Sequence, residues 1–234
     1  MKSTLLLAAL TAGLLCGQTK TIPRMPDGKP DLNGIWDHPY VPDMTKDGPN
    51  QKGAGALPFT PWGENNFKTY DVSKFDYTGH CLPFGLMRSV NVGGYPIQIV
   101  QYGKYLALLF EQNTWFHVVA MGRDHPKDLK PTWYGDSRAH WDGDTLVVDT
   151  IGLKDNSWID MPGHPHTKQM HLTERFHRRD YGNLEIQITI DDPGAYNKPW
   201  IQNRAATLET NFEMTEYVCN ENNQDPVHLD AGHK

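Results

Sequence analysis

The stretch Arg138-Ala-His-Trp-Asp-Gly-Asp-Thr-Leu-Val-Val-Asp149 decides the fold class. Two alternating segments flank Asp142-Gly143, a dipeptide that accepts the positive φ angles of a tight hairpin turn. If Asp142-Gly143 is a two-residue loop, Trp141 pairs with Asp144. One face of this hairpin then holds Ser137, Ala139, Trp141, Leu146 and Val148, and the other holds Asp136, Arg138, His140 and Asp149, with Arg138 within side-chain reach of Asp149. The pattern predicts an antiparallel sheet with a core behind one face.

Further segments with strand periodicity lie on both sides of this hairpin and are joined mostly by short turns. They cover residues 97–102, 105–111, 114–121, 170–180, 183–191, 201–209 and 212–220. A sheet of that length removes its exposed edges by closing on itself. Gly34-Ile-Trp36 opens the first strand, as in lipocalin-like barrels. We therefore predict an all-β, antiparallel up-and-down, lipocalin-like β-barrel of about eight or nine strands.

A Pro- and Gly-rich region precedes the strands. Residues 38–59 read as a long loop, and Thr60-Pro61-Trp62 predicts a short helix with Thr60 as its N-cap. We expect this N-terminal helix and loop region to pack on the outside of the barrel or over its mouth.

The first residues have the three-part layout of a secretory signal peptide. Lys2 precedes an apolar run from Leu5 to Leu15, which is too short to span a bilayer, and small and polar residues follow. We expect a signal peptide over residues 1–18, a single β-barrel domain over residues 19–234, and export to the periplasm or the extracellular space, without membrane insertion after signal cleavage. Lipidation of Cys16 is the second alternative, because Leu15 is bulky where lipoprotein signals have a small residue.

The charge balance argues against a polyanionic partner. The net charge is −6, and removal of Lys2 with the signal peptide makes it more negative by one. An acidic exported protein is a poor ligand for nucleic acid or for an anionic membrane surface.

Two cysteines, Cys81 and Cys219, remain beyond the signal peptide. An even pair in an oxidising compartment predicts one disulfide. The alternative is a pair of buried free thiols.

Histidines concentrate around Gly163-His-Pro-His166 and His171, with Glu174 three residues further on. His164, His166 and His171 are candidate ligands for a divalent metal, against the alternative of a polar loop with unliganded histidines. His166 or His171 beside Glu174 would also supply acid–base chemistry, with Arg138 stabilising an anion.

The two faces of the 170–180 strand both mix polar and apolar residues, which favours a barrel with a partly polar cavity as much as surface ion pairs. A two-residue turn at Tyr181-Gly182 pairs Glu174 with Thr189, and a bulge would slip this register by one.

Aromatic residues near strand ends are candidates for stacking on a flat ligand. The predicted ligand-binding residues are Trp141, Asp149, His140 and Trp158. The sequence has no Gly-x-Ser-x-Gly elbow, phosphate-binding loop, dinucleotide fingerprint or Cys-x-x-Cys, which disfavours hydride transfer, phosphoryl transfer and α/β-hydrolase chemistry.

Several motifs together resemble an uncharacterised family of exported bacterial proteins that is abundant in soil bacteria. They are Pro26-Asp-Gly-Lys-Pro-Asp-Leu-Asn-Gly-Ile-Trp36, Phe59-Thr-Pro-Trp62, Cys81-Leu-Pro, Trp141-Asp-Gly-Asp-Thr-Leu-Val-Val-Asp-Thr150, Gly163-His-Pro-His166, Thr173-Glu-Arg-Phe176, Ile190-Asp-Asp-Pro193, Lys198-Pro-Trp200 and Glu216-Tyr-Val-Cys-Asn-Glu-Asn222. The resemblance covers almost the whole chain after the signal peptide. It implies neither an activity nor catalytic residues.

A closed barrel is a container, so the sequence favours an exported protein that binds a small aromatic or carbohydrate-like molecule. The alternative is a lyase, isomerase or hydrolase with a His/Glu acid–base or metal site in the barrel.

Overall fold

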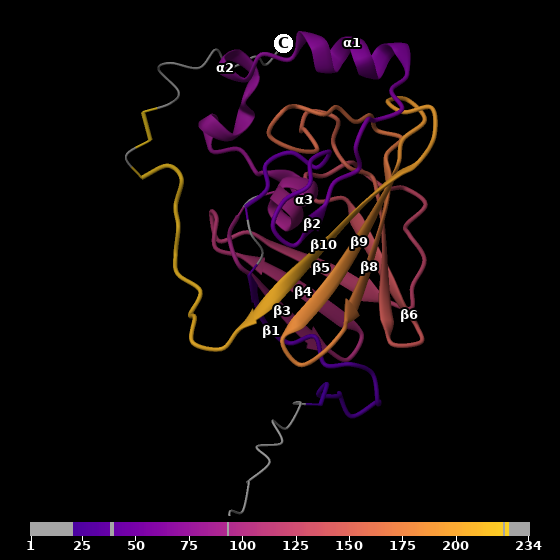
Figure 1. Ribbon diagram of the computed structural model, residues 1–234, viewed down its shortest axis with the longest axis vertical. Coiled ribbons are helices and arrows are strands. Elements are labelled where there is room, and N and C mark those ends of the chain that lie inside the picture. The colour runs from indigo at the N-terminus through magenta and orange to yellow at the C-terminus, as the bar shows by residue number, and fades with distance from the viewer. Residues whose placement is uncertain (1–20, 38–39, 93, 222, 225–234) are drawn as a thin grey trace, which may run out of the picture.

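The computed structural model describes residues 21–37, 40–92, 94–221 and 223–224, so the expected signal peptide lies outside the described residues. Ten strands form one sheet in the order β1-β3-β4-β5-β6-β7-β8-β9-β10-β2. They are β1 (Gly34–Asp37), β2 (Gln51–Lys52), β3 (Ile97–Tyr102), β4 (Tyr105–Phe110), β5 (Phe116–Met121), β6 (Asp136–Asp142), β7 (Thr145–Ile151), β8 (His171–Arg178), β9 (Asn183–Asp191) and β10 (Trp200–Glu209). Pairing of β1 with β10 closes nine of them into a barrel, which confirms the all-β barrel (Figure 1).

One joint departs from the predicted antiparallel order. Strands β5 and β6 run parallel, with Val119 opposite Ser137 and Met121 opposite Ala139. The reason is the odd number of strands. If every pair of neighbours in a closed ring is antiparallel, the ring must contain an even number of strands. A nine-stranded barrel therefore has at least one parallel joint, and the chain between β5 and β6 returns along the outside of the barrel.

The β6–β7 hairpin has the predicted faces but a shifted turn. Asp142 pairs with Thr145, so the two-residue loop is Gly143-Asp144 rather than Asp142-Gly143. Because the register changes by two residues, Ala139, Leu146 and Val148 remain together on the buried face.

The β8–β9 register shows the one-residue slip that a longer turn permits, with Glu174 opposite Ile188 and Arg178 opposite Leu184. Only the inward face of β8 mixes polar and apolar residues, with Leu172, Glu174, Phe176 and Arg178; the outward positions 171, 173, 175 and 177 are all polar, which corrects the expectation of two mixed faces.

The predicted last strand over residues 212–220 is wrong. This segment forms only an isolated bridge between Gln112 and Tyr217. The physical reason is that β1 and β2 already occupy the free edge of β10, so no barrel edge remains. The Cys81–Cys219 disulfide, with Cα atoms 5.5 Å apart, is confirmed and holds the segment in place.

Helices close one end of the barrel, at the top of Figure 1. They are α1 (Pro61–Thr69), α2 (Val72–Phe75) and the 3₁₀ turn η1 (Tyr77–His80). The Thr60 side chain accepts a hydrogen bond from the Gly63 N–H, as predicted for the N-cap of α1. No helix in the described part of the chain is long and apolar enough to cross a membrane.

A short helical segment, α3 (Gly85–Met87) followed by the π-helical turn η2 (Arg88–Val92), lies within the barrel (Figure 1). Leu86, Met87 and Val90 belong to the same core cluster as the inward residues of the strands. At the start of β1, Trp36 is 1% exposed and lies under the Arg178 guanidinium, 5.1 Å from the ring. The arginine over Trp36 is therefore Arg178 from β8, and not Arg204 of β10, which is the nearest substitute in the sequence for the arginine that covers this tryptophan in lipocalin-like barrels.

Two turn glycines give a matched test of the hairpin. Gly143 has φ +60°, Gly182 has no positive φ, and a Cβ at either position would meet no atom within 4 Å. We expect Gly143→Ala to lower the free energy of unfolding by about 1–2 kcal/mol, because only its backbone is left-handed. Gly182→Ala should have almost no effect. Denaturant unfolding of both variants measures the difference, and equal losses would contradict the turn geometry.

Candidate functional site

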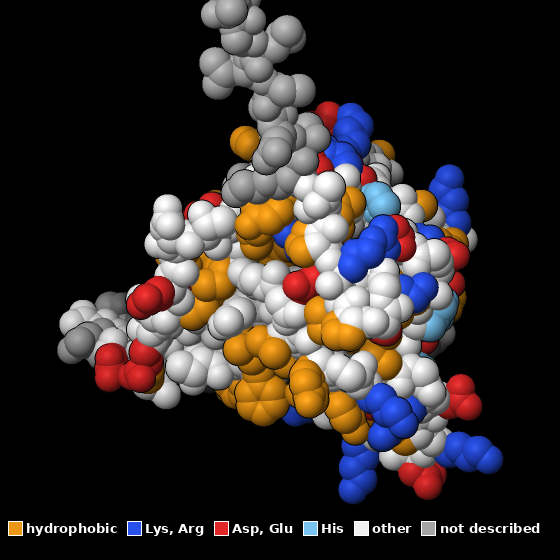
Figure 2. Space-filling view, turned by 90° about the horizontal axis from the view of Figure 1, so that it is seen from below, with side chains coloured by type: hydrophobic (Ala, Val, Ile, Leu, Met, Phe, Trp, Pro, Cys, Tyr) orange, Lys and Arg blue, Asp and Glu red, His pale blue; other side chains and the backbone are white. Residues whose placement is uncertain are grey.

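The open end of the barrel, opposite the helices, contains a pocket of about 240 Å³. Strand turns and the extended N-terminal segment of residues 22–32, which we call the lead-in, surround it. Its lining residues are Met25, Pro26, Asp27, Gln101, Tyr102, Gly103, Tyr105, Leu106, Met121, Trp141 and Leu146, and we call it the mouth pocket. Figure 2 views this end of the molecule and shows hydrophobic side chains gathered on it.

Contacts between residues that are far apart in sequence hold the lead-in across the mouth of the barrel. Arg24 donates two hydrogen bonds to the Asp144 carboxylate, at 3.0 and 2.6 Å. The Lys29 ammonium donates to the Gly143 carbonyl at 3.0 Å and lies 5.9 Å from the Trp141 ring. These contacts hold Met25, Pro26 and Asp27 over the pocket as one of its walls.

The pocket wall is mostly apolar and aromatic. Trp141, one of the predicted ligand-binding residues, is half-buried there, while Leu106 and Leu146 form the floor. Asp27 and Gln101 are the non-aromatic polar side chains of the lining, and Tyr102 and Tyr105 add hydroxyl groups. Since an apolar cavity of about 150 Å³ already holds benzene, this volume suits a molecule of one or two rings.

The barrel interior beyond the pocket is filled. The interior cavity between Trp36, Val90 and Phe176 measures only about 10 Å³. The helical segment Gly85–Val92 occupies the centre, so the interior is a packed core rather than a container.

Within that core lies a cluster of polar side chains on β8 and β10. Glu174 and Gln202 are 1% and 0% exposed, and an oxygen of each has no hydrogen-bond partner among the described residues. Both pair with Ile188 in the sheet, so they point inward at the same level of the barrel. Burial raises the pKa of Glu174 to about 7, against the opposing effect of the Arg204 charge, and burial lowers the pKa of Arg204 to about 10.

This buried carboxyl predicts an unusual pH dependence. A folded-state pKa of about 7, above the ordinary glutamate value of 4.5, means that Glu174 contributes most to stability below pH 4.5 and that the contribution is lost as pH rises through 7. We expect Glu174→Gln to be more stable than the parent at about pH 8, by on the order of 3 kcal/mol, and to lose this advantage at about pH 4.

Thermal unfolding across this pH range tests the effect. Glu213→Gln, at an exposed position, is the control and should follow the parent. A Glu174→Gln protein whose pH profile matches the parent would show that Glu174 does not titrate as described.

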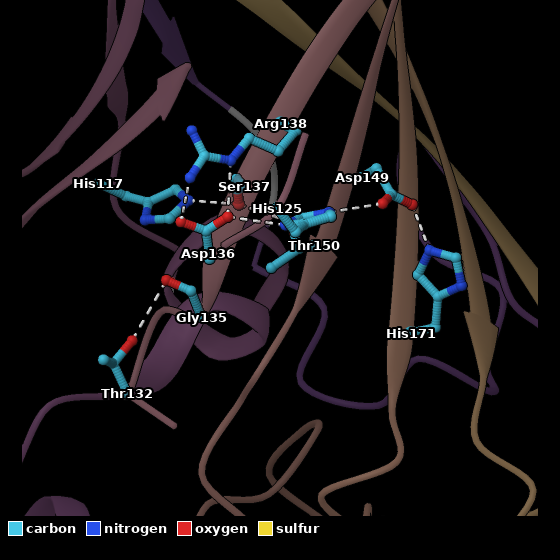
Figure 3. A network of polar contacts seen from close by, with 10 residues as sticks. All are labelled: His117, His125, Thr132, Gly135, Asp136, Ser137, Arg138, Asp149, Thr150 and His171. Atoms are coloured by element: carbon cyan, nitrogen blue, oxygen red, sulfur yellow. Dashed lines mark hydrogen bonds and ion pairs between the residues drawn. The ribbon is translucent and has the colours of Figure 1, made fainter. Parts of the chain in front are cut away.

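A second polar cluster lies on the outside of β6, β7 and β8 (Figure 3). His125, from the loop after β5, contacts Asp136 through Nδ1 at 2.7 Å and Asp149 through Nε2 at 2.8 Å. Arg138 donates twice to Asp136 at 2.7 Å, and His171 bonds the other oxygen of Asp149. Basic side chains and carboxylates therefore alternate along one chain of contacts, which we call the outer network.

The outer network holds the 122–135 loop against the barrel wall. This loop connects the parallel strands β5 and β6. His125 is the loop residue, and Asp136 and Asp149 are its anchors on the barrel wall. Burial alone would raise the pKa of Asp149, but hydrogen bonds from His171 and His125 outweigh it, and the pKa is lowered. Beneath this wall, His117 bonds Ser137 at 2.7 Å, and burial lowers its pKa to about 4, as for a neutral core histidine.

The lowered pKa gives the outer network a defined pH range. Asp149 contributes stability above its unfolded pKa of about 3.9, and the contribution is lost as pH falls through the lower folded value. We expect Asp149→Asn to lower the melting temperature at about pH 6 and to make the 122–135 loop more sensitive to protease, with little difference from the parent at about pH 2. An unchanged cleavage rate at pH 6 would mean that the loop is held by other contacts.

The predicted catalytic residues are not gathered at one place. Arg138 and His171 lie on the outer network, whereas Glu174 points inward, because residues 171 and 174 fall on opposite faces of β8. His166 is buried near the helical end, where its Nε2 lies 2.9 Å from the Ser157 Oγ and burial lowers its pKa.

The three predicted metal ligands are also separate. In the described residues, the group of metal-ligand type whose atoms lie within 4.8 Å of one another is Asp43, Asp160 and His164, without His166 or His171. Asp160 accepts hydrogen bonds from the Met44 N–H and from His164 Nδ1, so these groups already satisfy one another. The hydrogen bonds among these loop residues account for their closeness without a metal ion.

The predicted ligand-binding residues divide similarly. Trp141 lines the mouth pocket, Asp149 belongs to the outer network, His140 is exposed on β6, and Trp158 packs on Tyr70 near the helices. Sequence reasoning missed His125 and the lead-in residues Met25 to Asp27, which come from loops without periodicity. The signal in the sequence was the first of the resemblance motifs, which begins at Pro26 and includes Asp27 of the pocket wall.

Comparison with known proteins does not assign the chain to a family. No family model matches the chain, and no curated protein is similar to it in sequence.

Proposed function

We propose that this protein is an exported barrel that binds a small, flat, largely apolar molecule in the mouth pocket. The observation that carries the proposal is the pocket itself: about 240 Å³ of space walled by Trp141, Tyr102 and two methionines, at the end of a barrel whose interior is otherwise filled. Ligand sites are concave and mostly apolar, with a few polar groups that set orientation.

The lining favours an aromatic ligand over a carbohydrate-like one. Carbohydrates need many hydrogen-bonding groups around a stacking ring, whereas most of this lining is aromatic or aliphatic and Asp27 and Gln101 are its non-aromatic polar side chains. Trp141 offers a ring face, and Met25 and Met121 are soft side chains that adapt to ring edges.

Binding is favoured over catalysis because the polar residues suited to acid–base chemistry are distributed over three places. Glu174 is inside the core, His171 is on the outer wall, and His166 is at the helical end. None of them lines the mouth pocket.

Export remains part of the proposal, as does membership of the family of exported bacterial proteins that the motifs resemble. The Cys81–Cys219 disulfide supports an oxidising compartment. The signal-peptide pattern of residues 1–18 supports it from the sequence.

Two tryptophans allow a matched test. Trp141 lines the pocket, and Trp62 is 46% exposed on α1 at the other end of the barrel. Titration with the aromatic fluorescent probe anilinonaphthalene sulfonate should give saturable binding that Trp141→Ala weakens about tenfold or more, as for the loss of roughly 1.4 kcal/mol of contact. Trp62→Ala should bind like the parent.

A larger side chain at the pocket wall gives the complementary measurement. Met121→Trp should fill part of the space and also reduce probe binding. Equal probe affinity in Trp141→Ala and Trp62→Ala would contradict the proposed site. Mass spectrometry of protein purified from its native compartment then identifies the natural ligand.

A further inference from the structure

A second and larger groove lies on the outside of the barrel, against the neighbouring strands β8, β9, β10 and β2 (Figure 1). Its volume is about 600 Å³, and of the described residues none lines both this groove and the mouth pocket. Two adjacent cross-strand rows of outward side chains run along it: Thr145, His177, Glu185 and Ala205; Arg175, Gln187, Asn203 and Lys52. We call it the polar groove.

The turn before β2 forms one wall of the polar groove, and hydrogen bonds hold this turn in place. The Ala205 N–H donates to the Asn50 carbonyl at 2.8 Å. Gln51 is buried, and its side-chain amide donates to the carbonyls of Asp43 and Lys46 at 3.1 and 3.0 Å. A regular sheet and an anchored turn give the groove a fixed shape, and a pre-formed site loses little entropy when it binds a ligand.

The polar groove presents both hydrogen-bond donors and acceptors. Gln187 Nε2 donates to Asn203 Oδ1 at 3.1 Å, and this bond uses neither the Gln187 carbonyl nor the Asn203 amide hydrogens. Both side chains are exposed. In the neighbouring row, Thr145 adds a hydroxyl group and His177 an imidazole ring. These groups match a ligand with several hydroxyl groups, since each hydroxyl both donates and accepts.

The charged side chains of the polar groove are neutralised in pairs. The three ion pairs are Arg175 with Asp142 at 2.7 Å, Lys52 with Asp47 at 2.6 Å, and Glu185 with Arg179 at 3.3 Å. A polyanion would have to displace the carboxylates that already contact Arg175 and Lys52. The balance of charge therefore favours an uncharged ligand.

We propose that the polar groove binds a neutral oligosaccharide. Sugars combine hydroxyl groups with a ring face, and His177 places a flat ring between Thr145 and Glu185 in its row, while the small Ala205 leaves space at the end of that row. Each row of four residues crosses three strand spacings of about 4.8 Å, or roughly 14 Å, which is longer than a single sugar ring. The barrel then has two separate sites, one for an aromatic ligand and one for a polyhydroxylated ligand.

Affinity electrophoresis of the exported protein tests the proposal. Native gels contain no polymer, one of the neutral polysaccharides soluble starch, dextran, hydroxyethyl cellulose and galactomannan, or the polyanion dextran sulfate. At least one neutral polysaccharide should retard the parent, and a series of its concentrations gives the dissociation constant. Gln187→Ala should raise this constant about fivefold or more, as for the loss of a hydrogen-bonding side chain. Ala205→Tyr should fill the groove and abolish the retardation.

Gln98→Ala is the matched control, because Gln98 is an outward glutamine of β3 that lies outside the groove lining. It should be retarded like the parent. Thermal unfolding of each variant checks that the fold is kept, and Gln187→Ala, at an exposed position, keeps the test valid if Ala205→Tyr unfolds.

Three results would overturn the proposal. A parent that none of the neutral polysaccharides retards has no such site. Retardation by dextran sulfate alone would assign the groove to a polyanion. Retardation that is unchanged in both Gln187→Ala and Ala205→Tyr would place the sugar on another surface.

Discussion

The pairing of β1 with β10 is the constraint on which the rest of the structure depends. It joins Trp36 to Leu208 and closes the ring of nine strands. Gly34 makes this closure possible: its φ is +138°, and a Cβ there would approach the Leu208 Cδ1 to 2.6 Å. A ring of eight strands is just filled by its own side chains. The ninth strand adds interior space, and the helical segment Gly85–Val92 occupies it.

Filling the interior moves the candidate site to the rim. In a lipocalin-like barrel the ligand space is central, but here the centre holds α3, η2 and the polar pair Glu174 and Gln202. The remaining apolar space lies where the lead-in crosses the mouth near Trp141. The alternation of side chains along β8 also separates the polar residues from one another, because successive residues face the core and the outer network in turn.

Local patterns predicted the elements that local patterns control. Alternation of polar and apolar residues predicted the hairpins and the buried face with Leu146 and Val148. The preference for hydroxyl side chains at helix starts predicted Thr60 as an N-cap, and two cysteines after an export signal predicted the disulfide. The parallel joint was not predictable strand by strand, because it follows from the total number of strands. The helical segment Gly85–Val92 and the loop residue His125 lie outside any periodic pattern, and their positions depend on the closure of the barrel. The mouth pocket depends on Arg24 and Asp144, which are 120 residues apart.

Closure between the two ends of the sheet also orders events during synthesis. The chain emerges from its N-terminus, so β1 exists long before β10 is available to pair with it. During that interval its backbone groups are open to any passing strand, and contacts between such distant segments form slowly. Four residues beginning with glycine make a poor template for unwanted pairing, because short edge strands give few hydrogen bonds. The brevity of β1 thus protects the nascent chain from aggregation until its last strand arrives.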